Sequence, residues 1–438
     1  MKFFLSALLS LFILTCDEKG HDSGLVSIQD TTGVIIFRHA ELMDVEDGQV
    51  YHDMDVLVKG SIMTEIGKAL EISDAFEVDC RGKYLMPGLA DMHTHVYYEN
   101  DLLPYLANGV MTILNMGSPS SILELRSRAS RQEIISPTIF AGAFVDGAGS
   151  RGWVIRSPEE AVNDIAQIKA MGWDFIKVYN SVKKDVFLNI QSESDKNNLA
   201  IIGHGVREPG MEFILSHGQV MIAHMEEYLY THFNNTLDES LIPSAILITK
   251  SNGAYVTPNL SAYEAITEQW GNPSGLANLL KREEIKYVSP EWKTFWKSIN
   301  YTSNSGSIKS KYDFLKTLTK KFHDAGIPML LGSDSPYIPG LPNGFSIHDE
   351  LRNMVEAGLS SFEAIAAGTM VPGEFINKFV DGSKPFGLIK VGYKADLILL
   401  KANPFDNVGN IKKRAGIMAN GRWMSEGFLQ EKLSTLAN

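Results

Sequence analysis

Hydrophobic residues in the middle of the chain occur in short runs that alternate with helix-like segments. Between the runs, hydrophobic residues recur every three or four positions, as on one face of a helix. Seven runs lie at residues 112–117, 138–143, 174–179, 200–206, 220–225, 254–260 and 328–335. The run before His93 makes eight. Alternating strands and helices are typical of βαβ units, so the pattern predicts an α/β protein with a closed (β/α)8 barrel.

The predicted helices carry recognisable start signals. Ser157 is the expected N-cap of one helix, with a proline directly after it and Glu160 at the third helical position. Ser360 and Glu363 form the same pair at the start of another helix. A polar insertion from about residue 269 to 313 separates the seventh and eighth predicted strands.

Both ends of the folded part have a different pattern, that of short strands with turn residues between them. "GVIIF", "DMDVLVKG" and "FEVDC" lie near the start, and "ADLILLKANP" and "AGIMANGRWM" lie near the end. The pair Asn420 and Gly421 predicts a tight hairpin turn in the last of these segments.

The first residues resemble an export signal. Lys2 is followed by thirteen residues without a charge, a length that suits a signal-peptide core and is too short to span a bilayer as a helix. The ending "ILTC" at Cys16 resembles the lipobox of bacterial lipoproteins, although Leu14 and Thr15 depart from the preferred small residues. We expect a lipoprotein-type signal peptide over 1–16; the alternative is an ordinary signal cleavage site.

The expected mature protein is held at a membrane only by its lipid. Residues 17–30 are polar and read as a tether, and we expect export to the periplasm or outer membrane of a Gram-negative bacterium. With Cys16 acylated, Cys80 has no partner, so no intrachain disulfide is expected.

The composition of the chain limits the kinds of molecule that the protein is expected to bind. The chain has 438 residues, 44% hydrophobic content and a net charge of −12. This length and hydrophobic content suffice for a large core, and the acidic balance argues against nucleic acid as a partner. A small-molecule substrate is expected, and the oligomeric state stays open, a homo-oligomer included.

Residues with metal-ligand or acid-base chemistry follow several predicted strands. His93 and His95 are two positions apart, so an extended strand places both imidazoles on one face. Four further candidates lie at or near the C-terminal ends of later strands: Lys177, His204, His224 and Asp334. Active sites of barrel enzymes are built at this end of the strands, which favours one common site.

Five segments, in order, resemble motifs of the amidohydrolase superfamily of metal-dependent hydrolases: "PGLADMHTH", "FIKVY", "GHG", "AHMEE" and "GSDSP". The later "GLIKVGYKADLILL" resembles that family's return to a small β-sandwich, and the resemblance covers about residues 31–430. It implies a sandwich built from residues 31–88 and 381–430, a metal-binding barrel over 89–380 and a tail over 431–438.

The resemblance also implies a two-metal site with divalent ions, zinc first among them. His93 and His95 would bind one ion, and His204 and His224 the other. Lys177, as its CO2 adduct, would bridge the two ions. Imidazole and carboxylate ligands suit zinc, and two such ions acidify a shared water and polarise a carbonyl group.

The remaining member of the implied site is Asp334, which would contact the first metal and the water. It would take the water's proton and pass it to the leaving nitrogen. Single-metal branches of the family lack the lysine ligand, so the alternative for Lys177 is a surface or salt-bridged lysine.

The expected activity is hydrolysis of a C–N bond in an amide or peptide-like substrate. The motifs resemble the branch of imidazolonepropionases and Xaa-Pro dipeptidases, and Lys177 favours its two-metal, dipeptidase-like members. A deaminase, lactonase or phosphotriesterase on the same scaffold is the first alternative, and a non-catalytic binding lipoprotein is the second. Four residues near the expected mouth are candidates for holding a substrate carboxylate or, alternatively, for ordinary surface pairs: Arg151, Tyr179, Arg207 and Tyr228.

Overall fold

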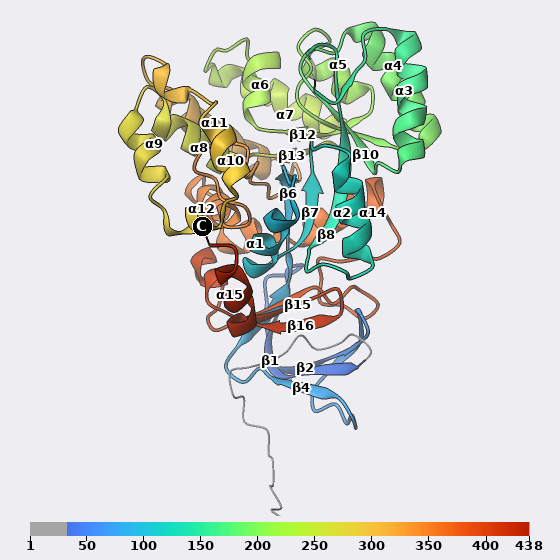
Figure 1. Cartoon of the computed structure of the whole chain (residues 1–438), viewed down its shortest axis with the longest axis vertical. Coiled ribbons are helices and arrows are strands. Elements are labelled where there is room, and N and C mark those ends of the chain that lie inside the picture. Colours follow the sequence, from blue (N-terminus) through green and yellow to red (C-terminus); the bar gives the residue numbers. More distant parts are fainter. Residues whose placement is uncertain (1–32, 150, 438) are drawn as a thin grey trace, which may run out of the picture.

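The middle of the chain forms a parallel barrel in the computed structural model, which describes residues 33–149 and 151–437. Its regular strands follow one another around the barrel: β6 (Leu89–Thr94), β7 (Val110–Asn115), β8 (Thr138–Asp146), β10 (Phe175–Val178), β11 (Ala200–Gly203), β12 (Gln219–Ala223) and β13 (Tyr255–Thr257). A short β9 (Trp153–Val154) pairs with β8. Figure 1 shows this barrel in the upper part of the molecule.

The eighth position is occupied by residues 328–335, which join β13 to β6. Parallel bridges connect Met329 to Val256 and Ser335 to Thr94. The Leu330 amide donates to the Val256 carbonyl at 2.9 Å. The segment is not a regular strand, and the left-handed φ of 59° at Asp334 is incompatible with extended backbone. The predicted (β/α)8 fold is confirmed, with its eighth strand reduced to bridges.

Helices surround the barrel, as the alternating pattern predicts. They are α1 (Leu102–Ala107), α2 (Ser121–Ser130), α3 (Pro158–Met171), α4 (Lys184–Asn197), α5 (Met211–Ser216), α6 (Glu226–Thr231), α7 (Ile242–Ser251), α8 (Leu260–Gln269), α11 (Lys309–Asp324), α12 (Ser346–Glu356), α13 (Ser361–Ala366) and α14 (Met370–Phe379). Ser157 caps α3 by accepting a hydrogen bond from the Glu160 amide at 3.2 Å. Ser360 and Glu363 form the capping box of α13. Both predicted start signals are confirmed.

The insertion between α8 and α11 is folded. It contains α9 (Pro273–Leu279) and α10 (Pro290–Trp296), with 3-10 turns at Glu283–Tyr287 and Tyr301–Ser303. Trp292 and Trp296 of α10 are buried. The Trp292 indole donates to Asp101 Oδ2 at 3.0 Å, and the Trp296 indole donates to the Pro336 carbonyl at 2.7 Å. These bonds attach the insertion to the loops that follow β6 and the eighth segment.

The two ends of the described chain form one eight-stranded sheet, shown below the barrel in Figure 1. Its strands are β1 (Val34–Met43), β2 (Val50–Lys59), β3 (Ile62–Gly67), β4 (Phe76–Asp79), β5 (Tyr84–Pro87), β14 (Leu397–Leu400), β15 (Arg414–Ala419) and β16 (Arg422–Ser425). β5 and β14 pair antiparallel and unite the two ends. Asn420 and Gly421 both have positive φ, 51° and 78°, as the predicted hairpin turn requires. The second, smaller β domain is confirmed.

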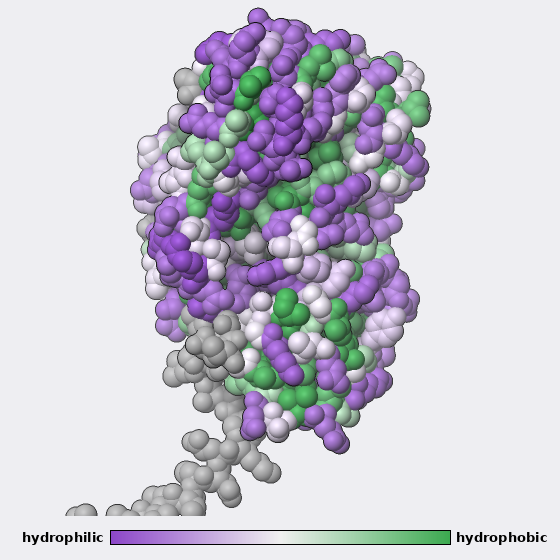
Figure 2. All heavy atoms as spheres, turned by 90° about the vertical axis from the view of Figure 1, so that its right-hand side faces the viewer, coloured by the Kyte–Doolittle hydropathy of each residue, from purple (hydrophilic) through white to green (hydrophobic). Residues whose placement is uncertain are grey.

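Four short helical elements complete the fold: η1 (Glu99–Asp101), η2 (Glu239–Leu241), η5 (Val408–Lys412) and α15 (Glu426–Ser434). The last one means that the first part of the expected tail is helical. In the face seen in Figure 2, hydrophilic residues predominate, and hydrophobic residues show between them in the barrel and in the lower sheet.

The expected membrane anchor lies outside the described residues. The signal peptide, Cys16 and the tether all belong to that part of the chain. Within residues 33–149 and 151–437, no helix is both long enough and apolar enough to cross a bilayer. Cys80 is buried with a free thiol.

Candidate metal centre and substrate cavity

The six candidate residues meet at the mouth of the barrel. His93 lies in β6 and Lys177 in β10, and His95, His204 and His224 come just after the ends of β6, β11 and β12. Asp334 lies in the eighth segment, and all six side chains are buried. Strand order around the barrel therefore brings together residues that are up to about 240 positions apart in the chain.

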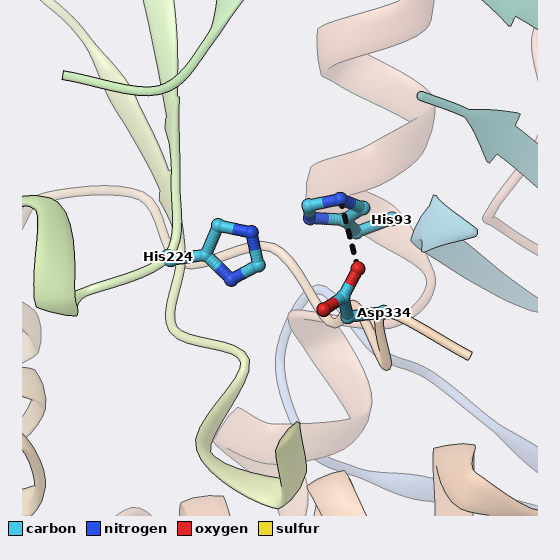
Figure 3. Close-up of side chains that lie close together, drawn as sticks. All are labelled: His93, His224 and Asp334. Carbon is cyan, nitrogen blue, oxygen red and sulfur yellow. Dashed lines mark ion pairs between the residues drawn. The ribbon is translucent and has the colours of Figure 1, made fainter. Parts of the chain in front are cut away.

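The closest contacts of this centre involve Asp334. Its Oδ1 lies 3.0 Å from His95 Nε2 and 3.3 Å from His93 Nε2. The ring centroid of His224 lies 4.6 Å from that of His93 and 4.8 Å from that of His204. Figure 3 shows His93 and His224 facing each other, with Asp334 below His93. One potential ligand atom from each of these three residues lies within 4.8 Å of the others.

Unusual backbone aims two of these side chains. His224 and Asp334 have φ values of 73° and 59°, a left-handed conformation that is uncommon for residues other than glycine. Backbone bonds hold both in place, since the His224 amide donates to Thr257 at 3.0 Å and the Asp334 amide donates to His93 at 2.7 Å. Strain of this kind concentrates at functional sites.

A glycine makes room for the buried lysine. Gly203 has φ of 138°, and a Cβ there would lie 2.3 Å from the Val178 carbonyl oxygen and 2.9 Å from Lys177 Cδ. Only glycine fits between these two strands. The first glycine of the "GHG" motif therefore allows Lys177 and His204 to share the mouth of the barrel.

Three of the imidazoles are held through Nδ1, which leaves Nε2 directed at the centre. Nδ1 of His93 lies 3.2 Å from Asn259 Oδ1, that of His95 lies 3.0 Å from the Gly117 carbonyl, and that of His204 lies 3.1 Å from both Asn180 Oδ1 and Glu227 Oε1. Such contacts to the second nitrogen orient metal-binding histidines.

A fully buried nitrogen in the centre has no hydrogen bond. Nε2 of His93 is buried, and no residue described by the structure accepts or donates a hydrogen bond there, because the nearby Asp334 oxygen lacks the required geometry. A buried, unsatisfied imidazole nitrogen that faces a second histidine and a carboxylate fits a divalent metal ion such as zinc.

Burial sets the charge state of these candidate ligands. It lowers the pKa of His93 and His204 well below the ordinary value and that of His224 to about 3, so the rings are neutral and offer lone pairs. Burial alone would raise the pKa of Asp334, but the His95 hydrogen bond and neighbouring histidines hold it below its ordinary value. The centre thus combines these three neutral imidazoles with an ionised carboxylate.

Lys177 is a buried lysine without an ion pair among the residues the structure describes, with 1% of its surface exposed. Its Nζ lies 3.8 Å from Met116 Sδ. Burial lowers the pKa of this amine to about 8, although Asp334 and Glu227 act in the opposite direction. These features differ from those of the surface or salt-bridged lysine that was the alternative.

A cavity of about 1040 Å³ lies above the centre. His95, Lys177, His204, His224 and Asp334 line its floor. Much of the rest is aromatic: Tyr97, Tyr98, Phe144, Trp153, Trp173, Tyr179, Trp292, Phe295, Tyr301 and Tyr337. The volume suits a small organic substrate.

Two of the four predicted substrate-binding residues line this cavity. They are Tyr179, whose ring centroid lies 4.3 Å from that of His204, and Arg151, which donates a hydrogen bond to the Tyr337 hydroxyl. Arg207 and Tyr228 are not among the described lining residues, which corrects the prediction.

Arg207 and Tyr228 instead contact other residues of the fold. Arg207 pairs with Glu227 and stacks over Tyr230 at 4.6 Å. The buried Tyr228 hydroxyl lies 2.7 Å from Thr249 Oγ1, because α6 turns that side chain toward α7. Arg207 and Tyr228 are close in sequence to the candidate metal ligands His204 and His224, but neither side chain enters the cavity.

Several residues around the site were not predicted from the sequence. Asn259 positions His93, Glu227 contacts His204, and Glu226 lines the cavity. The two glutamates belong to the "AHMEE" motif, so their proximity to His224 was the available signal. Burial, together with the charges of Glu227 and Asp334, raises the pKa of Glu226 to about 8.

Fold and site together define the class of protein. It is a (β/α)8 barrel with a candidate metal centre of four histidines, a lysine and an aspartate at its mouth. A family model described as the amidohydrolase family matches residues 84–424, which is more than half of the chain. The chain therefore belongs to the amidohydrolase family. The resemblance expected from the five motifs is confirmed.

Two solved structures are similar over most of their length. A putative prolidase from Bifidobacterium longum has a TM-score of 0.68 at 21% identity, covering 92% of this chain and 99% of that chain. A Xaa-Pro dipeptidase with methionine bound in its active site has a TM-score of 0.67 at 18% identity, covering 90% and 100%. At these identities the similarity establishes the shared fold.

Curated relatives match only a short part of the chain. A dihydroorotase from Carboxydothermus hydrogenoformans is 39% identical over 61 residues. This match spans 14% of the present chain and 14% of that enzyme.

Proposed function

We propose that this protein is a metal-dependent hydrolase that cleaves a C–N bond in a small amide or dipeptide. The observation that carries the proposal is the convergence of His93, His224 and Asp334 within 4.8 Å at the floor of a cavity large enough for such a substrate. Membership of the amidohydrolase family and the fold shared with a putative prolidase and a Xaa-Pro dipeptidase support the reaction class.

The metal would be held by the six residues of the candidate centre. His93, His95, His204 and His224 would supply nitrogen ligands, and Asp334 a carboxylate oxygen. Lys177, carrying a carbamate formed with CO2, would supply a second carboxylate, for which its burial and lack of an ion pair are suitable. Bound divalent ions would supply Lewis acidity, which lowers the pKa of a water and polarises the scissile carbonyl.

The protein's own groups then have separate tasks. Asp334 contacts His95 and His93 and faces the cavity, so it is placed to accept a proton from the attacking water and return it to the leaving nitrogen. Arg151 and Tyr179 line the same cavity and would hold a carboxylate of the substrate. The aromatic lining would exclude bulk water from the scissile bond.

Metal analysis and a substrate panel test this function. Protein without residues 1–16, prepared with zinc and bicarbonate, is expected to hold about two ions per chain. It should cleave at least one member of a panel of dipeptides with C-terminal proline, arginine or hydrophobic residues and N-acyl amino acids. His93→Ala should lose metal and activity together. Cleavage of only a lactone or a phosphotriester would replace the C–N assignment with the alternative enzyme class.

We further propose export as a lipid-anchored protein. The uncharged segment after Lys2 and the "ILTC" ending at Cys16 support this proposal. In a Gram-negative host, the full-length protein should partition into detergent, and Cys16→Ser should partition into the aqueous phase. Equal partitioning of both proteins would exclude the lipid anchor.

A further inference from the structure

Two consecutive glutamates follow the ligand His224, and the structure uses them differently. Glu227 is 1% exposed, lies 3.1 Å from His204 Nδ1 and forms an ion pair with Arg207. Glu226, the first residue of α6, lines the cavity. Within residues 33–149 and 151–437, Glu226 has no hydrogen-bond or ion-pair partner, so its carboxylate is available to a ligand.

The other acidic side chains of the cavity are occupied or peripheral. Asp334 belongs to the candidate metal centre. Asp146 accepts hydrogen bonds from the Gly147 and Ser181 amides, both at 2.8 Å. Glu291 is exposed at the rim. Glu226 is therefore the partly buried cavity carboxylate that neither the metal centre nor the backbone engages.

The surroundings of Glu226 suit a positively charged group. Tyr301, which lines the same cavity, lies within electrostatic reach of Glu226, as do Tyr230 and Tyr263. A carboxylate beside aromatic rings can bind a cation by an ion pair and by cation–π contacts. Arg207 and Lys311 both act on Glu226 through space, but Arg207 is already engaged by Glu227, and neither forms an ion pair with Glu226 in the part of the chain that the structure describes. A bound cation would supply the counter-charge that a partly buried carboxylate otherwise lacks.

We propose that Glu226 binds a protonated amine or guanidinium of the substrate and so selects cationic substrates. The inference rests on the proposed hydrolysis only in that the ligand is called a substrate. Arginine and citrulline separate charge from size, because citrulline replaces the guanidinium with a neutral group of almost the same shape. Dipeptides carrying one or the other, at the C-terminal or at the N-terminal position, give two matched pairs.

Two measurements test the proposal. In the first, the zinc-loaded wild type should cleave the arginine member of at least one pair with kcat/KM about 10-fold or more above the citrulline member. Glu226→Gln should bring that ratio close to one. Glu291→Gln removes a negative charge from the rim of the same cavity and should leave the ratio unchanged. Metal content, measured for each variant, separates loss of recognition from loss of the centre.

In the second measurement, calorimetry compares free L-arginine with L-citrulline and does not depend on turnover. Tighter binding of arginine by wild type that is lost in Glu226→Gln would support the role of Glu226 even if no dipeptide is cleaved, in which case the hydrolysis proposal alone fails. Equal binding of the two amino acids by wild type, with no charge preference in cleavage, would overturn the role of Glu226 whether or not dipeptides are cleaved. An arginine preference that persists in Glu226→Gln would overturn it as well.

Discussion

The floor of the cavity comes from strand ends, whereas part of its wall comes from the insertion and from loops. On the floor, the candidate metal ligands are fixed by barrel hydrogen bonds, such as those from the His204 amide to the Val178 carbonyl at 3.0 Å and from the His224 amide to the Thr257 carbonyl at 3.0 Å. On the wall, the indole of Trp292 donates a single hydrogen bond, to Asp101 Oδ2 at 3.0 Å. The difference implies that the floor determines the chemistry and the wall determines which substrate reaches it.

The largest effect should come from Asp334, the floor residue proposed to transfer the proton. Asp334→Asn keeps the shape of the side chain but removes the proton acceptor. We expect a loss of about 10²-fold or more in kcat with little change in KM, measured by steady-state kinetics on the best dipeptide of the panel. Bound metal should largely remain. Near-wild-type turnover of this variant would contradict the proton-transfer role.

The next effect tests whether the floor depends on the residues behind it. Glu227→Gln removes the charge that faces His204 Nδ1 and keeps the size of the side chain. Partners of metal-binding histidines typically contribute 10- to 100-fold to metal affinity, and we expect about 10-fold weaker zinc binding in competition with a chelator. Unchanged affinity would mean that Asn180 alone orients this ring.

On the wall, Trp292→Ala should affect substrate binding more than the chemical step. The side chain is 3% exposed and lines the cavity, so its removal should raise KM about 10-fold with a smaller change in kcat. The same change should lower the free energy of unfolding by about 3–5 kcal/mol, measured with denaturant. A fall in kcat as large as that of Asp334→Asn would show that wall and floor do not act separately.

The smallest effect on activity is expected at Asp101, which accepts the hydrogen bond of Trp292 in the cavity wall. Asp101 accepts hydrogen bonds from the Tyr97 and Tyr98 amides, each at 3.0 Å, and from Trp292. Burial raises its pKa in the folded protein to about 6, above the unfolded value of about 3.9. Its contribution to stability is therefore full below pH 4 and is lost as the pH rises through 6.

Asp101→Asn abolishes this titration. Relative to wild type, the variant should gain roughly 1–3 kcal/mol in unfolding free energy between pH 4 and pH 7, with kcat unchanged. Denaturant titrations of both proteins across this range measure the difference, in which contributions from the histidines cancel. A constant difference across the range would contradict the raised pKa.

The sequence predicted the floor well because strand ends impose order on it. His204 and His224 follow β11 and β12 directly, so local strand patterns were sufficient to place them. The wall was less accessible. Trp292 lies in a segment that reads as a polar insertion, and its contact with Asp101 joins residues 191 positions apart. No local pattern specifies such a contact.

The substrate-binding predictions show the same limit. Tyr179 lies two positions after Lys177, directly after the end of β10, where the alternation of the strand still sets side-chain direction, and it lines the cavity. Tyr228 lies four residues after His224, but the chain has already entered α6, whose rotation turns that hydroxyl toward Thr249. The eighth segment departs from a regular strand at Asp334 because the backbone there is left-handed, which residue patterns do not reveal.

The pairing of β5 with β14 has a consequence for the order of folding during synthesis. Pro87 lies opposite Leu397, so this pair closes across about 310 residues. At about 5–20 residues per second, a ribosome takes roughly 15–60 s to make the intervening chain. In a chain that folds as it is made, the whole barrel emerges in that interval, while β5 presents an edge that has no partner strand yet. Shielding this edge, by a chaperone or by transient contacts with the young barrel, becomes a requirement of biosynthesis that the finished fold no longer displays.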